Sequence, residues 1–142
     1  MKTSTGKRPT RLPTSFKGLT AVMVPHAITD DVDYYNVVEL MNRLAMVAHP
    51  TGEQEHYLKT LEAVVESHDR EHADPLLDAA GSTPIARLRY LVESSGTTVT
   101  GLGRIIGSVP AASLILNGKR ELSKEHIRKL AAHFKVRADY FL

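Results

Sequence analysis

Cysteine is absent from the 142 residues, which excludes disulfides and thiolate chemistry and favours an intracellular, cytoplasmic protein. No apolar run approaches the roughly 20 residues that a membrane-spanning helix needs, and no apolar segment follows the basic N-terminus as a secretory signal requires. The chain also lacks a glycine-rich phosphate loop and a G-x-S-x-G motif. We therefore expect no membrane insertion, no cofactor and no enzymatic activity.

Charge is distributed unevenly, although the formal net charge is only +2. Residues 1–28 hold five basic and no acidic residues, residues 29–80 hold three basic and twelve acidic, and residues 81–142 hold ten basic and four acidic. An acidic middle beside a basic C-terminal half indicates two surfaces for two partners, a basic protein and a polyanion. Chance clustering on solvated helix faces gives the same counts, so charge alone leaves both interpretations open.

The chain is predicted to begin with a flexible basic tail, residues 1–18, because this stretch has few large apolar side chains to bury. The tail is either a solubilising extension or an arm that contacts DNA phosphates or a neighbouring subunit. Residues 20–24 are β-prone and predict either one short strand or extended chain.

Residues 19–74 are predicted to form an N-terminal helical region that binds a partner or a second copy of the chain. Apolar residues at three- and four-residue steps indicate a helix from about Asp30 to Ala48. Thr51 and Gln54 have the spacing of a capping box and start a second helix, which gives an αα-hairpin.

The C-terminal half is predicted to be helical in short pieces. Residues 75–83 contain proline, glycine and serine and read as a linker, and apolar periodicity restarts in a domain spanning residues 84–142. Cap and stop residues divide that domain into four helices and a final turn; these are Thr83, Gly96, Thr98, Gly107, Ser108, Gly118 and Ser123. The expected fold class is all-α, with a possible short N-terminal strand.

The turn at Gly107 and Ser108 sets the helix starting near residue 109 across the one before it, as in a helix-turn-helix unit. The segment Leu116-Asn117-Gly118-Lys119-Arg120-Glu121-Leu122-Ser123 resembles the phage-repressor-like helix-turn-helix family, with the closest likeness to its HigA-type antitoxins. Upstream, Asn42-Arg43-Leu44-Ala45 and Gly52-Glu53 resemble the N-terminal domain of the same antitoxins.

This resemblance implies a five-helix lambda-repressor-like domain and an antitoxin that neutralises a HigB-type (RelE-like) mRNA-cleaving toxin. It also implies a homodimer that binds double-stranded operator DNA and represses its own operon. A basic, RNA-holding toxin would suit the acidic segment 29–80. The alternative is a stand-alone helix-turn-helix transcriptional regulator without a toxin partner.

In such a helix-turn-helix unit, the expected DNA contacts lie at the starts of its two helices and in the loop that follows the second helix. These residues are Thr98, Ser108, Val109, Pro110, Ala111, Ser113, Asn117, Lys119 and Arg120. The start of the recognition helix departs from the family pattern at Val109, Pro110 and Ala111. None of these three side chains can hydrogen-bond a base edge. Two interpretations follow: a repressor that reads thymine methyl groups and DNA shape, or a scaffold with reduced DNA binding.

The only enzymatic motif is His68-Asp69-Arg70-Glu71-His72, which matches the H-x-x-E-H pattern of inverted zinc proteases. His68 and His72 would share one helix face, but a third protein ligand is missing from the pattern. We therefore predict no metal site here.

Overall fold

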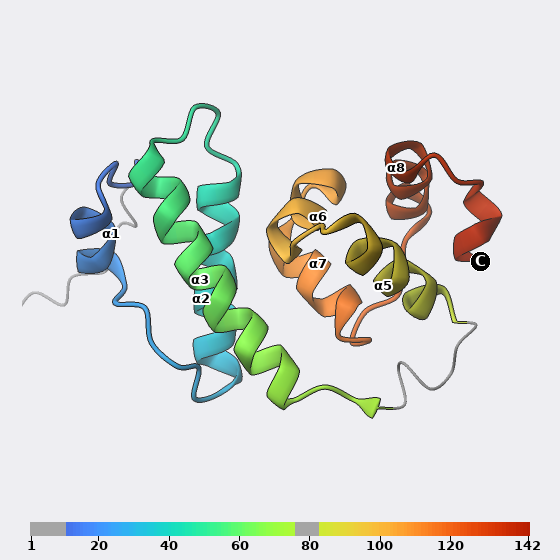
Figure 1. Ribbon diagram of the computed structural model, residues 1–142, viewed down its shortest axis with the longest axis horizontal. Coiled ribbons are helices and arrows are strands. Elements are labelled where there is room, and N and C mark those ends of the chain that lie inside the picture. The colour runs from blue at the N-terminus through green and yellow to red at the C-terminus, as the bar shows by residue number, and fades with distance from the viewer. Residues whose placement is uncertain (1–10, 76–82) are drawn as a thin grey trace, which may run out of the picture.

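The computed structural model describes residues 11–75 and 83–142, and within those ranges the regular elements are all helices (Figure 1). The predicted all-α fold class is confirmed. The elements are α1 (Phe16–Val22), α2 (Asp31–Ala45), α3 (Gly52–Glu71), α5 (Pro84–Ser95), α6 (Val99–Ile106), α7 (Val109–Leu116), α8 (Lys124–Phe134) and the 3-10 helix η1 (Ala138–Phe141).

The helix starts follow the capping residues read from the sequence. Thr51 and Gln54 form the expected capping box of α3, in which the Thr51 hydroxyl accepts from the Gln54 amide and the Gln54 side chain accepts from the Thr51 amide. The side-chain caps of α2, α5, α6, α7 and α8 are Asp30, Thr83, Thr98, Ser108 and Ser123. Gly96 and Gly107 end α5 and α6 with φ of 68° and 96°, which only glycine adopts without strain.

The N-terminal segment differs from the prediction. Residues 16–22 form a helix where a tail, followed by a short strand or extended chain, was expected, and no strand occurs in residues 11–75. Ser15 caps α1, and Leu19 is fully buried in the hydrophobic cluster of the hairpin. Tertiary burial of one face therefore overrides the β propensity of residues 20–24. The expected tail residues 1–10 lie outside the described ranges.

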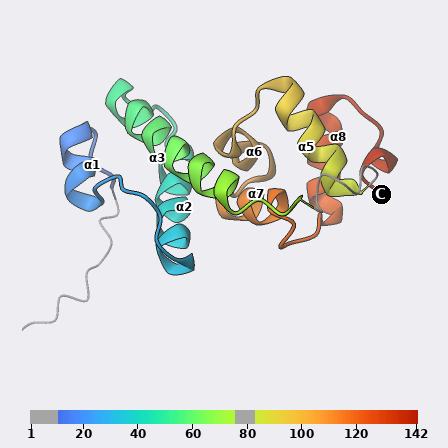
Figure 2. The ribbon, with the colours of Figure 1, turned by 60° about the horizontal axis from the view of Figure 1, so that its bottom comes forward.

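The described residues build two hydrophobic clusters. One lies among α1, α2 and α3, with Met41, Tyr57 and Leu61 fully buried. The other fills the bundle of α5 to α8 and η1, with Leu88 and Phe141 near its centre. In Figures 1 and 2 the α2–α3 hairpin stands beside α6 and α7, and α2 packs directly on both.

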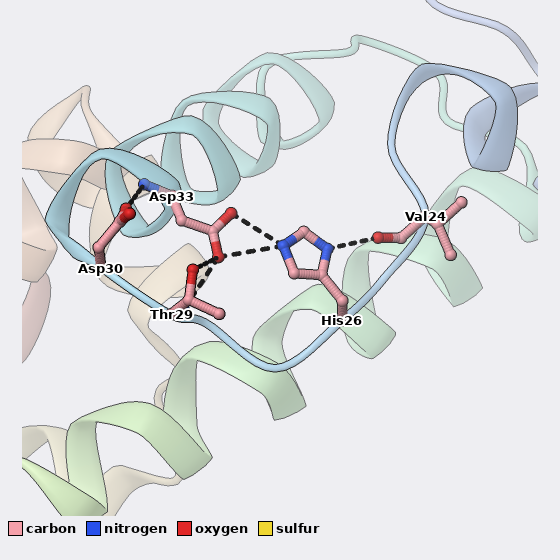
Figure 3. Close-up of polar contacts among 5 residues, drawn as sticks. All are labelled: Val24, His26, Thr29, Asp30 and Asp33. Carbon is pink, nitrogen blue, oxygen red and sulfur yellow. Dashed lines mark hydrogen bonds and ion pairs between the residues drawn. The ribbon is translucent and has the colours of Figure 1, made fainter.

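His26, in the segment between α1 and α2, hydrogen-bonds the backbone of its own segment and a side chain of α2 (Figure 3). His26 Nδ1 lies 2.7 Å from the Val24 carbonyl oxygen, and Nε2 lies 2.8 Å from Asp33 Oδ1. Both partners are acceptors, so the geometry favours the doubly protonated ring, and these bonds raise the pKa of His26 above its usual value. The Thr29 amide donates a hydrogen bond to the Asp33 carboxylate, and this bond, followed by the one from His26, lowers the pKa of Asp33. With both ring nitrogens engaged, the pair is a structural clamp.

We predict that the clamp stabilises the fold only in a limited pH range. The raised pKa of His26 gives a stabilisation that is fully present below about pH 6.5 and lost as the pH rises through the folded-state pKa. The lowered pKa of Asp33 gives a second contribution to fold stability, which is present above about pH 4 and is lost as the pH falls through the folded-state pKa of Asp33. His26→Gln should therefore lower the melting temperature at pH 5.5 more than at pH 8. The same change at the exposed His49 should have little effect, and equal losses from His26→Gln at both pH values would contradict the clamp.

Candidate nucleic-acid interface

Helices α6 and α7 have the geometry of a helix-turn-helix. Their axes meet at 116°, within the range of about 90–120° typical of that motif. Gly107 turns the chain between them in the left-handed conformation, and its amide closes α6 on the Gly103 carbonyl at 2.7 Å. The Ser108 hydroxyl then accepts from the Ala111 amide and starts α7. This order of elements fixes α7 as the recognition helix of the motif.

Gly103 allows the two helices to approach. A Cβ atom at this position would lie 2.5 Å from Val109 Cγ2 and 2.7 Å from Val109 Cα. Backbone cannot move aside as a flexible side chain does, so any larger residue forces α6 and α7 apart. Glycine has a low helix propensity and so weakens α6, but at position 103 its missing side chain sets how closely α6 and α7 cross.

The predicted DNA contacts fall into three groups by exposure. Thr98, Lys119 and Arg120 are exposed, while Ser108, Pro110 and Asn117 are half-buried. Val109, Ala111 and Ser113 are buried, with Val109 fully enclosed and Ser113 only 1% exposed. The loop after α7 is therefore accessible to a phosphate backbone, whereas much of the start of α7 is covered.

The N-terminal hairpin covers one side of α7. Val109 belongs to the hydrophobic cluster of α1 to α3, and its amide donates to Asn42 Oδ1 at 3.0 Å. Ser113 and Asn117 follow at four-residue steps and both hydrogen-bond Tyr34 of α2. Packing against the hairpin thus explains the apolar residue at Val109, whereas Ala111 packs into the core of the α5–α8 bundle.

The exposed loop after α7 leads into a basic surface. Lys119 and Arg120 precede α8, whose first turns add the exposed Lys124 and Arg128. Burial first, and then the positive charge of Arg120, lower the pKa of His126 in the first turn of α8. These cations are suited to phosphate contacts beside a recognition helix.

The H-x-x-E-H residues form no metal site of three or more ligands within the described chain. The rings of His68 and His72 stack with their centroids 4.1 Å apart, and His72 Nδ1 lies 2.9 Å from the His68 carbonyl oxygen. The motif thus occupies the end of α3 as part of its packing and capping.

No single helix of the described segments is long and apolar enough to cross a membrane. Helices α6 and α7 taken together have the length and apolar composition of a membrane span, but the pair is sharply bent between them.

The comparisons with known proteins agree with this geometry. A family model described as helix-turn-helix matches residues 88–141. These residues form a helix-turn-helix domain. The chain is also 40% identical over 58 residues to antitoxin HigA of Escherichia coli K12 and, to the same degree, to antitoxin HigA of Shigella flexneri. The matched stretch covers 41% of this chain and 41% of each relative, and no solved structure matches. The resemblance to HigA-type antitoxins is therefore confirmed over that stretch.

Three residues of the hairpin were missed as parts of this interface. Tyr34, Asn42 and Asp69 hold α7 by hydrogen bonds, and none of them was predicted from the sequence to contact this helix. The signal that could have found them is the apolar start of α7, because a buried Val109 requires a covering partner.

We predict that α6 tolerates alanine in place of Gly101 but not in place of Gly103. Gly103→Ala should destabilise the protein by about 1–3 kcal/mol, because the new methyl group overlaps the α7 backbone. Gly101→Ala is the matched control, since its Cβ meets two side-chain atoms, Thr97 Cγ2 at 3.2 Å and Thr98 Oγ1 at 3.5 Å, and helix propensity improves. Its stability should change by less than about 1 kcal/mol. Urea unfolding measures both, and equal effects would contradict the close approach.

Proposed function

We propose that this protein is an antitoxin that binds operator DNA through its helix-turn-helix domain and neutralises a toxin through its N-terminal hairpin. The observation that carries the proposal is the α6–α7 motif, followed by an exposed basic loop, in a chain similar to antitoxin HigA. The protein acts by binding and has no catalytic role.

The DNA half of the proposal rests on the accessible part of the motif. Thr98 at the start of α6, and Lys119 and Arg120 after α7, contact phosphates and orient the domain on the duplex. As a homodimer, the protein presents two recognition helices about 34 Å apart to successive major grooves of a palindromic operator. Binding there represses the operon that encodes it.

The toxin half of the proposal rests on charge. Helix α3 exposes Glu55 and Glu66, and its first turn also carries Glu53. A HigB-type toxin must hold RNA and is therefore basic, so it suits this acidic surface. Neutralisation follows when the hairpin covers the RNA-binding or catalytic surface of the toxin.

A gel shift with the DNA upstream of the gene, over a series of salt concentrations, tests DNA binding. The double variant Lys119→Ala/Arg120→Ala should bind at least about tenfold more weakly and lose close to two units of the salt slope, since each lost phosphate contact removes about 0.9. Lys17→Ala/Lys59→Ala removes the same charge from α1 and α3 and should leave the slope unchanged. Absence of any shift at low salt for the wild type would refute operator binding.

Rescue of growth tests toxin binding, with the product of any toxin-sized reading frame beside the gene expressed as the toxin. The wild type should restore growth, and Glu55→Lys/Glu66→Lys should fail because it reverses the charge of the docking surface. Glu121→Lys reverses an exposed charge in the helix-turn-helix domain and should still rescue. Full rescue by the α3 double variant would show that this face is not the toxin contact, and a failure of the wild type would favour a stand-alone regulator.

A further inference from the structure

One stripe of the recognition helix is committed to the hairpin. Val109, Ser113 and Asn117 recur at four-residue steps and so share one face of α7. Val109 and Ser113 are almost fully inaccessible, although both stand at positions from which a recognition helix reads bases. Ala112 and Ile115 fill the core of the bundle from the opposite side. The accessible part of α7 is thereby reduced to apolar side chains such as the half-buried Pro110 and the exposed Leu114, which cannot hydrogen-bond a base edge.

The polar atoms of this stripe are already used. The Tyr34 hydroxyl donates to Asp69 Oδ1 at 2.8 Å, so Ser113, which hydrogen-bonds the same oxygen, must donate its own proton to it. The Asn117 amide nitrogen lies 3.2 Å from Tyr34 Oη and 3.4 Å from Asp69 Oδ1. Burial raises the pKa of Tyr34, which stays a neutral donor at physiological pH. We call these four residues the Tyr34 clasp.

Carboxylates of α3 also face the positive end of α6. A cleft of about 470 Å³ has Glu62, Glu66 and Asp69 on one wall and Thr98 and Val99 on the other. The free amides and dipole at a helix N-terminus attract anions, and a DNA phosphate would be held at the same place. Negative side chains of the hairpin therefore stand where the negative backbone of a duplex would approach.

We propose that the hairpin and DNA compete for the same face of the helix-turn-helix, so that the closed form described here is the DNA-free form. Operator binding then requires the Tyr34 clasp to open and the hairpin to leave α7. The inference rests on the proposed DNA binding and adds its regulation. Only the open fraction binds, so the apparent affinity is lower than the intrinsic one by that fraction.

The first test compares two tyrosine-to-phenylalanine variants of the full chain by gel shift with the upstream DNA. Tyr34→Phe removes the hydroxyl that joins the hairpin to α7 and should tighten DNA binding by about tenfold, equivalent to about 1.4 kcal/mol of clasp stability. Tyr57→Phe is the matched control, because the Tyr57 hydroxyl donates to the Met23 carbonyl within the N-terminal unit at 2.5 Å. Its DNA affinity should match that of the wild type. Unchanged binding by Tyr34→Phe would overturn the competition.

The second test locks the closed form. Because the chain has no cysteine, Glu66→Cys/Glu93→Cys introduces the only two thiols, one on α3 and one on α5 beside the same cleft. A reducible bis-maleimide linker should abolish the gel shift, and reduction of the same sample should restore it. Equal binding before and after reduction would overturn the competition but leave operator binding intact. No shift in any form, Tyr34→Phe included, would refute operator binding itself.

Discussion

Burial of Val109 in the hydrophobic cluster of the hairpin is the contact on which the arrangement depends. It needs Gly103 behind it, because a side chain there would push α7 away from α6. It also brings the amide of Val109 to Asn42, and it places Ser113 and Asn117 beside Tyr34. One apolar residue at the start of the recognition helix thereby joins the two halves of the protein.

The same contact relates stability to function. Packing of the hairpin on α7 removes apolar surface from water, and the Tyr34 clasp satisfies the polar groups that are buried with it. Yet the covered face is the one that a helix-turn-helix domain offers to the major groove. Under the proposed competition, the protein gains stability from the same contact that DNA binding would break. Any partner of the hairpin that favours its release will raise DNA affinity, and by linkage DNA will favour that partner.

Local sequence rules predicted most of the helices because their signals lie within a few residues. Thr51 with Gln54, Thr98 with Gly107, and Ser123 each mark a boundary that the structure confirms. Helix α1 was missed because its stability comes from Leu19 packing on α3, a contact distant in sequence. The contact between Tyr34 and Ser113 joins residues 79 positions apart, and no local pattern could show it.

Amide hydrogen exchange at Val109 tests the central contact most directly. This amide lies in the first turn of α7, where no intrahelical acceptor exists, and it donates to the Asn42 side chain of the hairpin. The account predicts slow exchange in the wild type and much faster exchange in Asn42→Ala, while the fully buried Ile115 in the last turn of the helix stays protected in both. Exchange at Val109 as fast as in an unstructured peptide would show that the hairpin does not cover the recognition helix.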